Sequence, residues 1–136
     1  MSLNILVVDD SLVVRSMILK TLRIAGTPIG QEHQASNGAE GLEVLKNNWI
    51  DLVFVDINMP VMNGEEMIDR IRESNEWSDL PVIVVSTEGS KARIERLMSK
   101  GVRFIHKPFH PESVREAVQD LLGITFERGV DNDSSF

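Results

Sequence analysis

The chain has 136 residues and 42% hydrophobic content, which suits one compact domain with a single core. Its 14 Lys and Arg residues against 21 Asp and Glu residues give a net charge of −7, so neither nucleic acid nor an anionic membrane is expected as a partner. The chain has no cysteine, which excludes disulfides and thiolate sites, and no signal-peptide pattern or membrane-length apolar stretch, so we expect a soluble, cytoplasmic protein.

Short apolar runs alternate with longer segments of helical period, which predicts an α/β fold with a parallel sheet covered on both faces. The first run, NILVVD (residues 4–9), is continuously aliphatic and predicts a central strand. A helix is expected to follow, from an N-cap at Ser11 to a stop at Gly26. Residues 31–36 are polar and predict an edge strand at best, and residues 39–48 predict a short helix.

The second half of the chain continues this alternation. DLVFVD (residues 51–56) predicts another buried strand, and like the first run it ends in an aspartate. Residues 124–136 lose all periodicity, so we expect a domain of residues 1–123 followed by a mobile tail. The remaining elements are predicted as a helix that buries Met67, Ile68 and Ile71, a strand at 82–85, a helix at 90–101, a strand at 102–106 and a last helix from Pro111 to Gly123.

Polar side chains stand where the predicted strands end. Because the carboxyl ends of parallel strands share one sheet edge, we expect Asp9, Asp10, Asp56, Ser86 and Lys107 to converge. Three carboxylates at close range repel one another, so the cluster needs raised pKa values or a bound cation. A donor set made only of oxygen atoms favours a hard divalent cation, and few carboxylates suit Mg²⁺ better than Ca²⁺.

A calcium-binding loop beginning at Asp56 is excluded by its residues. The fifth, sixth and twelfth positions are Pro60, Val61 and Met67, where such a loop needs an oxygen ligand, a glycine and a glutamate.

A carboxylate-held cation beside a lysine and a hydroxyl is typical of sites that handle phosphoryl groups. Asp56 is the expected nucleophile, because a carboxylate at a strand end can form an acyl phosphate without a general base. Asp9 and Asp10 would hold the metal, Ser86 would hydrogen-bond to a phosphoryl oxygen, and Lys107 would pair with the phosphoryl group.

Two further groups of residues have simpler interpretations. Trp49 and Trp77 are expected to be packing residues. A basic helix side is expected to be solvated or to form a docking surface for an acidic partner, and it comprises Lys91, Arg93, Arg96, Lys100 and Arg103.

Four motifs in order, VVDDS, FVDINMPVMNG, PVIVVST and FIHKPF, resemble the response-regulator receiver domain, most closely the free-standing chemotaxis type. The resemblance covers about residues 3–123. It implies a three-layer (βα)₅ flavodoxin-like fold, doubly wound, with the parallel strands in the order 2-1-3-4-5.

The resemblance also implies phosphorylation of Asp56 by transfer from the phosphohistidine of a sensor histidine kinase or a histidine phosphotransfer protein. Asp10 would then bind Mg²⁺ directly, Asp9 through water and Asn58 through its backbone carbonyl, with Asp56 completing the site. Lys107 would precede a cis Pro108. No enzymatic activity is expected beyond catalysis of the chain's own phosphorylation and dephosphorylation.

By the same resemblance, Ser86 and Phe104 would form the conformational switch. Movement of the Ser86 hydroxyl toward the phosphoryl group would open space for Phe104. The helix at 90–100, the strand at 102–106 and the last helix would form the output face, so a downstream protein is expected to bind over residues 90–122. The lifetime of the phosphoryl group is expected to be tuned by Asn58, Thr87 and Glu88.

Three alternative functions fit these residues less well. A haloacid-dehalogenase-type hydrolase needs an acid two positions after its nucleophile, where this chain has Asn58. A flavin-binding protein of the same topology needs a Ser/Thr-rich phosphate loop where Asp9 and Asp10 stand. The third is an interaction module that does not depend on phosphorylation, and Asp10, Asp56, Ser86 and Lys107 argue against it.

Overall fold

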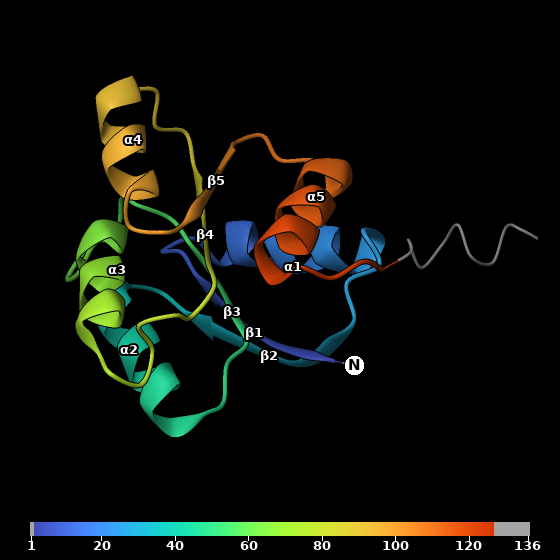
Figure 1. Ribbon diagram of the computed structural model, residues 1–136, viewed down its shortest axis with the longest axis horizontal. Coiled ribbons are helices and arrows are strands. Elements are labelled where there is room, and N and C mark those ends of the chain that lie inside the picture. The colour runs from blue at the N-terminus through green and yellow to red at the C-terminus, as the bar shows by residue number, and fades with distance from the viewer. Residues whose placement is uncertain (1, 127–136) are drawn as a thin grey trace, which may run out of the picture.

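The computed structural model describes residues 2–126 (Figure 1). Within them, five parallel strands form one sheet in the order β2-β1-β3-β4-β5, which confirms the expected fold class and strand order. The strands are β1 Leu3–Val8, β2 Ile29–Ala35, β3 Leu52–Val55, β4 Val82–Ser86 and β5 Arg103–His106. The helices are α1 Leu12–Ile24, α2 Gly38–Asn47, α3 Gly64–Glu73, α4 Lys91–Met98 and α5 Pro111–Leu122.

Helices cover both faces of the sheet, which makes three layers (Figure 1). Along β1, Ile5 and Val7 face α1 and α5, whereas Leu6 and Val8 face the other side, where α2, α3 and α4 pack. All four of these side chains are fully buried. Burial on both faces explains why the central strands are continuously aliphatic instead of alternating with polar residues.

Side-chain caps begin four of the helices, shortly after a strand has ended. Each cap oxygen accepts a backbone N–H from the first helical turn, which satisfies a donor that has no partner within the helix. The caps are Ser11 to Val14 at 3.2 Å, Asn37 to Glu40 at 2.9 Å, Asn63 to Glu66 at 2.9 Å and Ser90 to Arg93 at 3.3 Å.

Strand β2 is an edge strand, as predicted, but it begins at Ile29, two residues before the predicted start. Its first residue pairs with Leu3 of β1. Main-chain pairing of this kind needs no apolar side chains, so a polar segment gives little indication of where the strand starts.

The first residues of the expected tail lie against α5. The carbonyl oxygen of Phe126 accepts hydrogen bonds from Arg115 Nη2 at 2.7 Å and Gln119 Nε2 at 3.0 Å. Residues 127–136, the rest of the predicted tail, lie outside the described residues. No helix in the described part of the chain is long and apolar enough to cross a membrane.

Candidate functional site

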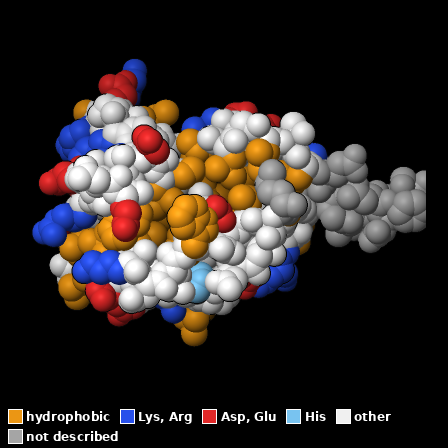
Figure 2. Space-filling view, turned by 60° about the horizontal axis from the view of Figure 1, so that its bottom comes forward, with side chains coloured by type: hydrophobic (Ala, Val, Ile, Leu, Met, Phe, Trp, Pro, Cys, Tyr) orange, Lys and Arg blue, Asp and Glu red, His pale blue; other side chains and the backbone are white. Residues whose placement is uncertain are grey.

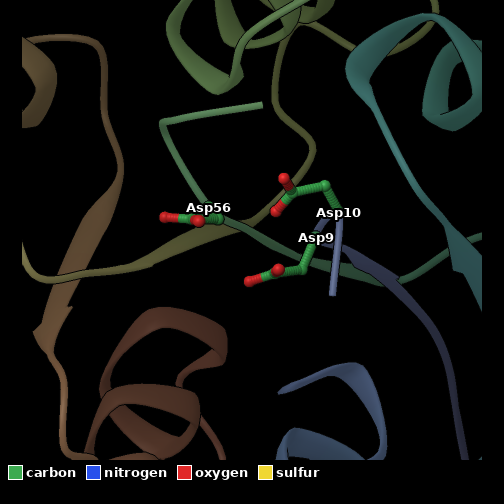
Figure 3. A group of neighbouring side chains, drawn as sticks. All are labelled: Asp9, Asp10 and Asp56. Carbon is green, nitrogen blue, oxygen red and sulfur yellow. The ribbon is translucent and has the colours of Figure 1, made fainter. Parts of the chain in front are cut away.

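Three carboxylates meet at the edge where β1 and β3 end (Figure 3). Asp9 and Asp10 follow β1, Asp56 follows β3, and one oxygen atom from each lies within 4.8 Å of the others. Asp9 is buried, Asp56 is half-buried and Asp10 is exposed, so the cluster extends from the interior to the surface.

The carboxylate of Asp9 is held in place from several sides. Its Oδ1 accepts the backbone N–H of Ser11 at 2.9 Å, and its Oδ2 lies 3.4 Å from Lys107 Nζ. The Asp9 carbonyl oxygen also accepts a hydrogen bond from Arg15 Nη1 at 2.6 Å. These contacts stabilise a charge that is almost fully buried.

Asp56 is positioned by its neighbours on the sheet. Its backbone N–H donates to Val8 O at 3.0 Å, which extends the pairing of β1 and β3 to the aspartate itself. Its Oδ1 accepts the backbone N–H of Ile57 at 2.8 Å, and its Oδ2 lies 3.6 Å from Lys107 Nζ. Burial raises the pKa of Asp56, the charge of Asp9 raises it further, and the nearby Lys107 ammonium opposes both effects.

Lys107 and Ser86 complete the arrangement from β5 and β4. The backbone N–H of Lys107 donates to Ser86 O at 2.9 Å, and the peptide bond from Lys107 to Pro108 is cis, as the resemblance implied. Ser86 is fully buried, and its Oγ accepts the backbone N–H of Glu88 at 3.1 Å. The predicted convergence of the strand ends is therefore present for the carboxylates and the lysine.

The donor chemistry of this cluster fits a hard divalent cation. Three carboxylates converge, and in residues 2–126 the one ammonium group in contact with them is that of Lys107, so negative charge is in excess. All the converging acidic ligand atoms are carboxylate oxygens, which Mg²⁺ prefers over nitrogen or sulfur.

The residues expected to tune the site follow shortly after the ends of β3 and β4. Asn58 is exposed two positions beyond Asp56, and Thr87 is exposed just after β4. Glu88 instead turns toward the start of α4, where its Oε2 accepts the N–H of Ser90 at 2.9 Å and its Oε1 pairs with Arg93 at 2.9 Å.

Phe104, the expected switch aromatic, lies on β5 and is half-buried against the core on the α4 side. Its ring meets the His106 ring edge to face, with centroids 4.8 Å apart.

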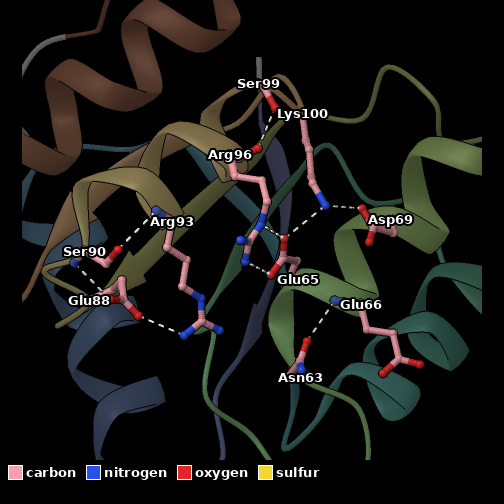
Figure 4. A network of polar contacts seen from close by, with 10 residues as sticks. All are labelled: Asn63, Glu65, Glu66, Asp69, Glu88, Ser90, Arg93, Arg96, Ser99 and Lys100. Carbon is pink, nitrogen blue, oxygen red and sulfur yellow. Dashed lines mark hydrogen bonds and ion pairs between the residues drawn. The ribbon is translucent and has the colours of Figure 1, made fainter.

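An ion-pair network between α3 and α4 was not predicted (Figure 4). Glu65, in the first turn of α3, accepts two hydrogen bonds from the Arg96 guanidinium, each at 2.8 Å, and lies 3.2 Å from Lys100 Nζ. Lys100 also pairs with Asp69 at 2.6 Å. The Arg96 hydrogen bonds, followed by those of Lys100, lower the pKa of Glu65 to about 2.

This network revises the interpretation of the basic helix side. Four of its five residues form ion pairs within the molecule: Arg93 with Glu88, Arg96 and Lys100 with Glu65, and Arg103 with Asp120. The predicted docking surface for an acidic partner therefore has most of its charge already neutralised.

The loop that leaves Asp56 returns closely onto it. Gly64 N donates to Ile57 O at 2.8 Å, and a Cβ atom at Gly64 would overlap the carbonyl oxygen of Asp56. Between these points Met62 N donates to Pro60 O at 2.7 Å, and Val61 has a positive φ of 67°, a strained value for a β-branched residue. The start of α3 is thus fixed directly against the backbone of Asp56 and Ile57.

Comparison with known proteins identifies the family. The response regulator receiver domain matches residues 5–119. A chemotaxis protein CheY homolog of Campylobacter jejuni is 38% identical over 125 residues, which cover 89% of this chain and 93% of that protein. Chemotaxis protein CheY1 of Helicobacter pylori is 36% identical over 89% of this chain and 98% of its own length.

The fold agrees with this match. The crystal structure of the chemotaxis response regulator CheY4 of Vibrio cholerae is 30% identical, with a TM-score of 0.77 over 89% of this chain and 99% of that one. This chain therefore belongs to the family of response regulator receiver domains, the two-component signalling domains whose function is phosphorylation on an aspartate.

Proposed function

We propose that Asp56 is the phosphoryl acceptor, and that its phosphorylation switches the face formed by α4, β5 and α5. One observation carries this proposal: Lys107 Nζ lies within 4 Å of both Asp56 and Asp9, so a cation stands beside the carboxylate that would receive the group. This arrangement favours neutralisation of the charge that develops on a transferring phosphoryl group.

Asp56 is the best placed of the three carboxylates for this role. In both residues Oδ1 accepts a backbone N–H and Oδ2 lies near Lys107, but the side chain of Asp9 is only 2% exposed, whereas that of Asp56 is 12% exposed. A phosphoryl donor needs access to the attacking oxygen, and Asp9 offers little. Asp10 is exposed and suits the mouth of a metal site better than a buried acceptor.

We propose that Asp9, Asp10 and Asp56 hold a Mg²⁺ ion, with Asn58 contributing its backbone carbonyl oxygen. When bound, the ion would supply positive charge beside the attacking carboxylate and the phosphoryl oxygens. Lys107 would supply a second positive charge from the side of β5, where it is held by its backbone bond to Ser86.

The reaction is a displacement at phosphorus. A carboxylate oxygen of Asp56 forms the new bond, and the bond from phosphorus to the imidazole nitrogen of the donor breaks. The donor is proposed to be a phosphohistidine of a sensor kinase or a histidine phosphotransfer protein. Burial of Asp56, which raises its pKa, increases the basicity of the attacking oxygen, and Lys107 limits that increase.

The switch would begin at Ser86. Its oxygen accepts the N–H of Glu88, which leaves the hydroxyl hydrogen free to be directed toward a phosphoryl oxygen. That movement would alter the segment from β4 to α4, which Glu88 holds through Ser90 and Arg93. Half-buried Phe104 would then repack inward, and Asn58, Thr87 and Glu88 would set how long the phosphoryl group persists.

The proposed output is binding of a downstream protein over residues 90–122. In the unphosphorylated protein, α4 is restrained by the pairs that Arg96 and Lys100 make with Glu65 (Figure 4). A change driven by the phosphoryl group would therefore either break or retain these ion pairs with Glu65.

A phosphoryl mimic tests this proposal. In the presence of Mg²⁺, beryllofluoride should give bound fluorine resonances with wild-type protein and none with Asp56→Asn. Amide hydrogen exchange should change in α4 and β5 of the wild type. Binding that survives Asp56→Asn would contradict the acceptor assignment, and binding without any change in α4 or β5 would contradict the switch.

A further inference from the structure

A second candidate site lies at the amino ends of the strands, opposite the carboxyl ends where the carboxylate cluster lies. A cavity of about 970 Å³ opens where β1, β3 and β4 begin, and its lining includes Ser2, Asp51 and Pro81, which directly precede these strands. We call it the basal cavity. Its size suits a ligand or an inserted side chain, since protein ligand sites commonly span about 300–1,000 Å³.

The two tryptophans of the chain both line the basal cavity. Trp77 is half-buried against the core, but Trp49 is 78% exposed, so the prediction that Trp49 is a packing residue is wrong. A largely exposed aromatic ring buries little surface within its own chain and leaves much of its face available to a partner. Figure 2 shows hydrophobic side chains gathered in the middle of a surface that also carries acidic groups.

The position of Trp49 is defined, although it is exposed. Its Nε1 donates to Asp51 Oδ1 at 3.0 Å, and Asp51 Oδ2 accepts the backbone N–H of Asn4 at 2.8 Å. The indole is therefore tied to β1 through a single carboxylate. Ordered aromatic groups lose less conformational entropy when they bind.

The opposite wall is also held in place. Arg72 Nη1 donates to Leu80 O at 2.7 Å and to Ser78 O at 3.2 Å, and Leu80 N donates to Trp77 O at 3.0 Å. These bonds fix the segment between α3 and β4 that carries Trp77. The cavity is thus preformed between two anchored walls.

The charge of the lining is acidic. Among the described residues it contains the carboxylates of Asp51, Glu76 and Asp79 and the ammonium group of Lys46, which pairs with Glu43 at 3.5 Å, and Asp79 also interacts with the charge of Arg72 behind the wall. Aromatic faces beside carboxylates attract cations, and a planar guanidinium can stack on indole while it donates to a carboxylate. Apolar lining from Leu3, Leu80, Leu122 and Ile124, among others, favours aliphatic groups next to that cation, in keeping with a peptide segment.

We propose that the basal cavity binds a segment of a partner protein that inserts an arginine side chain flanked by apolar residues. None of the residues that line the cavity belongs to the carboxylate cluster or is Ser86 or Lys107. Because the two sites share no residues, the proposal predicts that binding there does not depend on phosphorylation and holds a partner on the receiver in both signalling states.

Tryptophan fluorescence tests this directly, because the chain has two tryptophans and no tyrosine, and both tryptophans line the cavity. The probe is the peptide acetyl-Leu-Arg-Leu-amide, and its matched control has citrulline, the uncharged isostere, in place of arginine. We expect a saturable fluorescence change with the arginine peptide. The affinity for the citrulline peptide should be about fivefold weaker. Equal affinities would overturn cation recognition.

Variants locate the binding. Trp49→Ala should abolish it, with Trp77 as the remaining fluorophore, and the pair Glu76→Gln with Asp79→Asn should weaken it severalfold. Glu95→Gln, which removes one exposed charge from α4, is the matched control and should leave the affinity unchanged. Unchanged affinity in Trp49→Ala would overturn the proposed location.

Two further comparisons complete the test. Arginine amide alone should bind far more weakly than the tripeptide, and equal affinity would replace the partner segment with a small organic cation and overturn the proposal. The peptide affinity should be the same for wild type with or without Mg²⁺ and beryllofluoride, and for Asp56→Asn. A dependence on the mimic would overturn the independence of the two sites, whereas failure of Asp56 to accept phosphate would leave the peptide result untouched.

Discussion

The ammonium nitrogen of Lys107 lies 3.6 Å from Oδ2 of Asp56, although β4 separates β5 from β3 in the sheet. The contact joins the two residues that the proposed phosphoryl transfer needs most, a nucleophile and a positive charge beside it. Lys107 is held there by its own backbone, which donates to Ser86 O at 2.9 Å. The pair therefore predicts how the site responds to substitution.

Replacement of Lys107 by methionine should slow phosphorylation of the protein. The side chain keeps its length but loses the charge that stabilises the transferring group, and loss of one such group commonly costs about 10²-fold in rate. The measurement is the rate of phosphoryl incorporation from acetyl phosphate, followed by mass spectrometry. Lys20→Met, at an exposed position of α1, is the control and should react like wild type. A Lys107→Met rate equal to wild type would remove Lys107 from the reaction.

Asp56→Asn should stabilise the protein at neutral pH when divalent cations are chelated. Burial raises the folded-state pKa of Asp56 above its ordinary value of 3.8, so the folded protein binds that proton more tightly than the unfolded chain does. Proton binding at Asp56 stabilises the folded state fully below a pH of 3.8, and this stabilisation is lost as the pH rises through the folded-state pKa.

Urea unfolding of wild type and Asp56→Asn over a pH series measures this effect. The stability advantage of Asp56→Asn should shrink as the pH falls and Asp56 becomes protonated. Asp120→Asn, at a largely exposed side chain, should show no comparable gain. A destabilised Asp56→Asn protein would contradict the assigned direction of the pKa.

Glu65→Gln should weaken the attachment of α4 to α3. The pKa of Glu65 is lowered from 4.5 to about 2, so its contribution is present above pH 4.5 and is lost as the pH falls toward 2. The Arg96 side chain is 56% exposed, so solvent screening reduces the contribution to about 1–2 kcal/mol. We expect this loss of unfolding free energy at neutral pH, and faster amide exchange in α4.

The neighbouring residue gives a matched control for this change. Glu66 also lies in the first turn of α3, but it reaches Arg70 only at 3.8 Å and both side chains are at least half exposed. Glu66→Gln should change stability by about 0.5 kcal/mol or less. Equal effects of the two substitutions would mean that the helix terminus matters, and not the link to α4.

Gly64→Ala should disrupt the site through its backbone. A Cβ atom there would overlap Asp56 O and approach the Ile57 Cα to 2.9 Å, and neither atom can move without displacing β3. We expect a loss of about 3 kcal/mol or more in unfolding free energy. Gly89→Ala is the control, because a Cβ there meets nothing within 4 Å. A fully stable Gly64→Ala protein would contradict the close approach of α3 to Asp56.

The sequence was sufficient to predict the carboxylate cluster for a physical reason. Buried parallel strands need long aliphatic runs, so β1 and β3 were visible as patterns, and parallel strands must end at a common edge. Asp9 and Asp56 were therefore expected at the same edge of the sheet, and they lie close together because β1 and β3 are neighbouring strands. The strand order and the cis bond before Pro108 came only from the resemblance to a family, because no pattern of apolar residues specifies them.

Other features depend on contacts between distant parts of the chain. Glu65 and Arg96 are 31 positions apart, and nothing in either helix alone indicates that they meet. Glu88 lies near the site in sequence, yet its side chain turns to Ser90 and Arg93 because the start of α4 offers an N–H and a guanidinium. Trp49 was expected to be a packing residue, but it lies in the loop between α2 and β3, where its side chain is largely exposed.

The most direct test of this account is the intact mass of the protein after treatment with acetyl phosphate, with Mg²⁺ and with a chelator. Wild type should gain the mass of one phosphoryl group only when Mg²⁺ is present, and peptide mapping should place that group on Asp56. Asp56→Asn should gain nothing, and Asp51→Asn, which changes an aspartate at the start of β3 instead of its end, should react as wild type does. A phosphoryl group that is absent from wild type, or that is retained in Asp56→Asn, would contradict Asp56 as the acceptor.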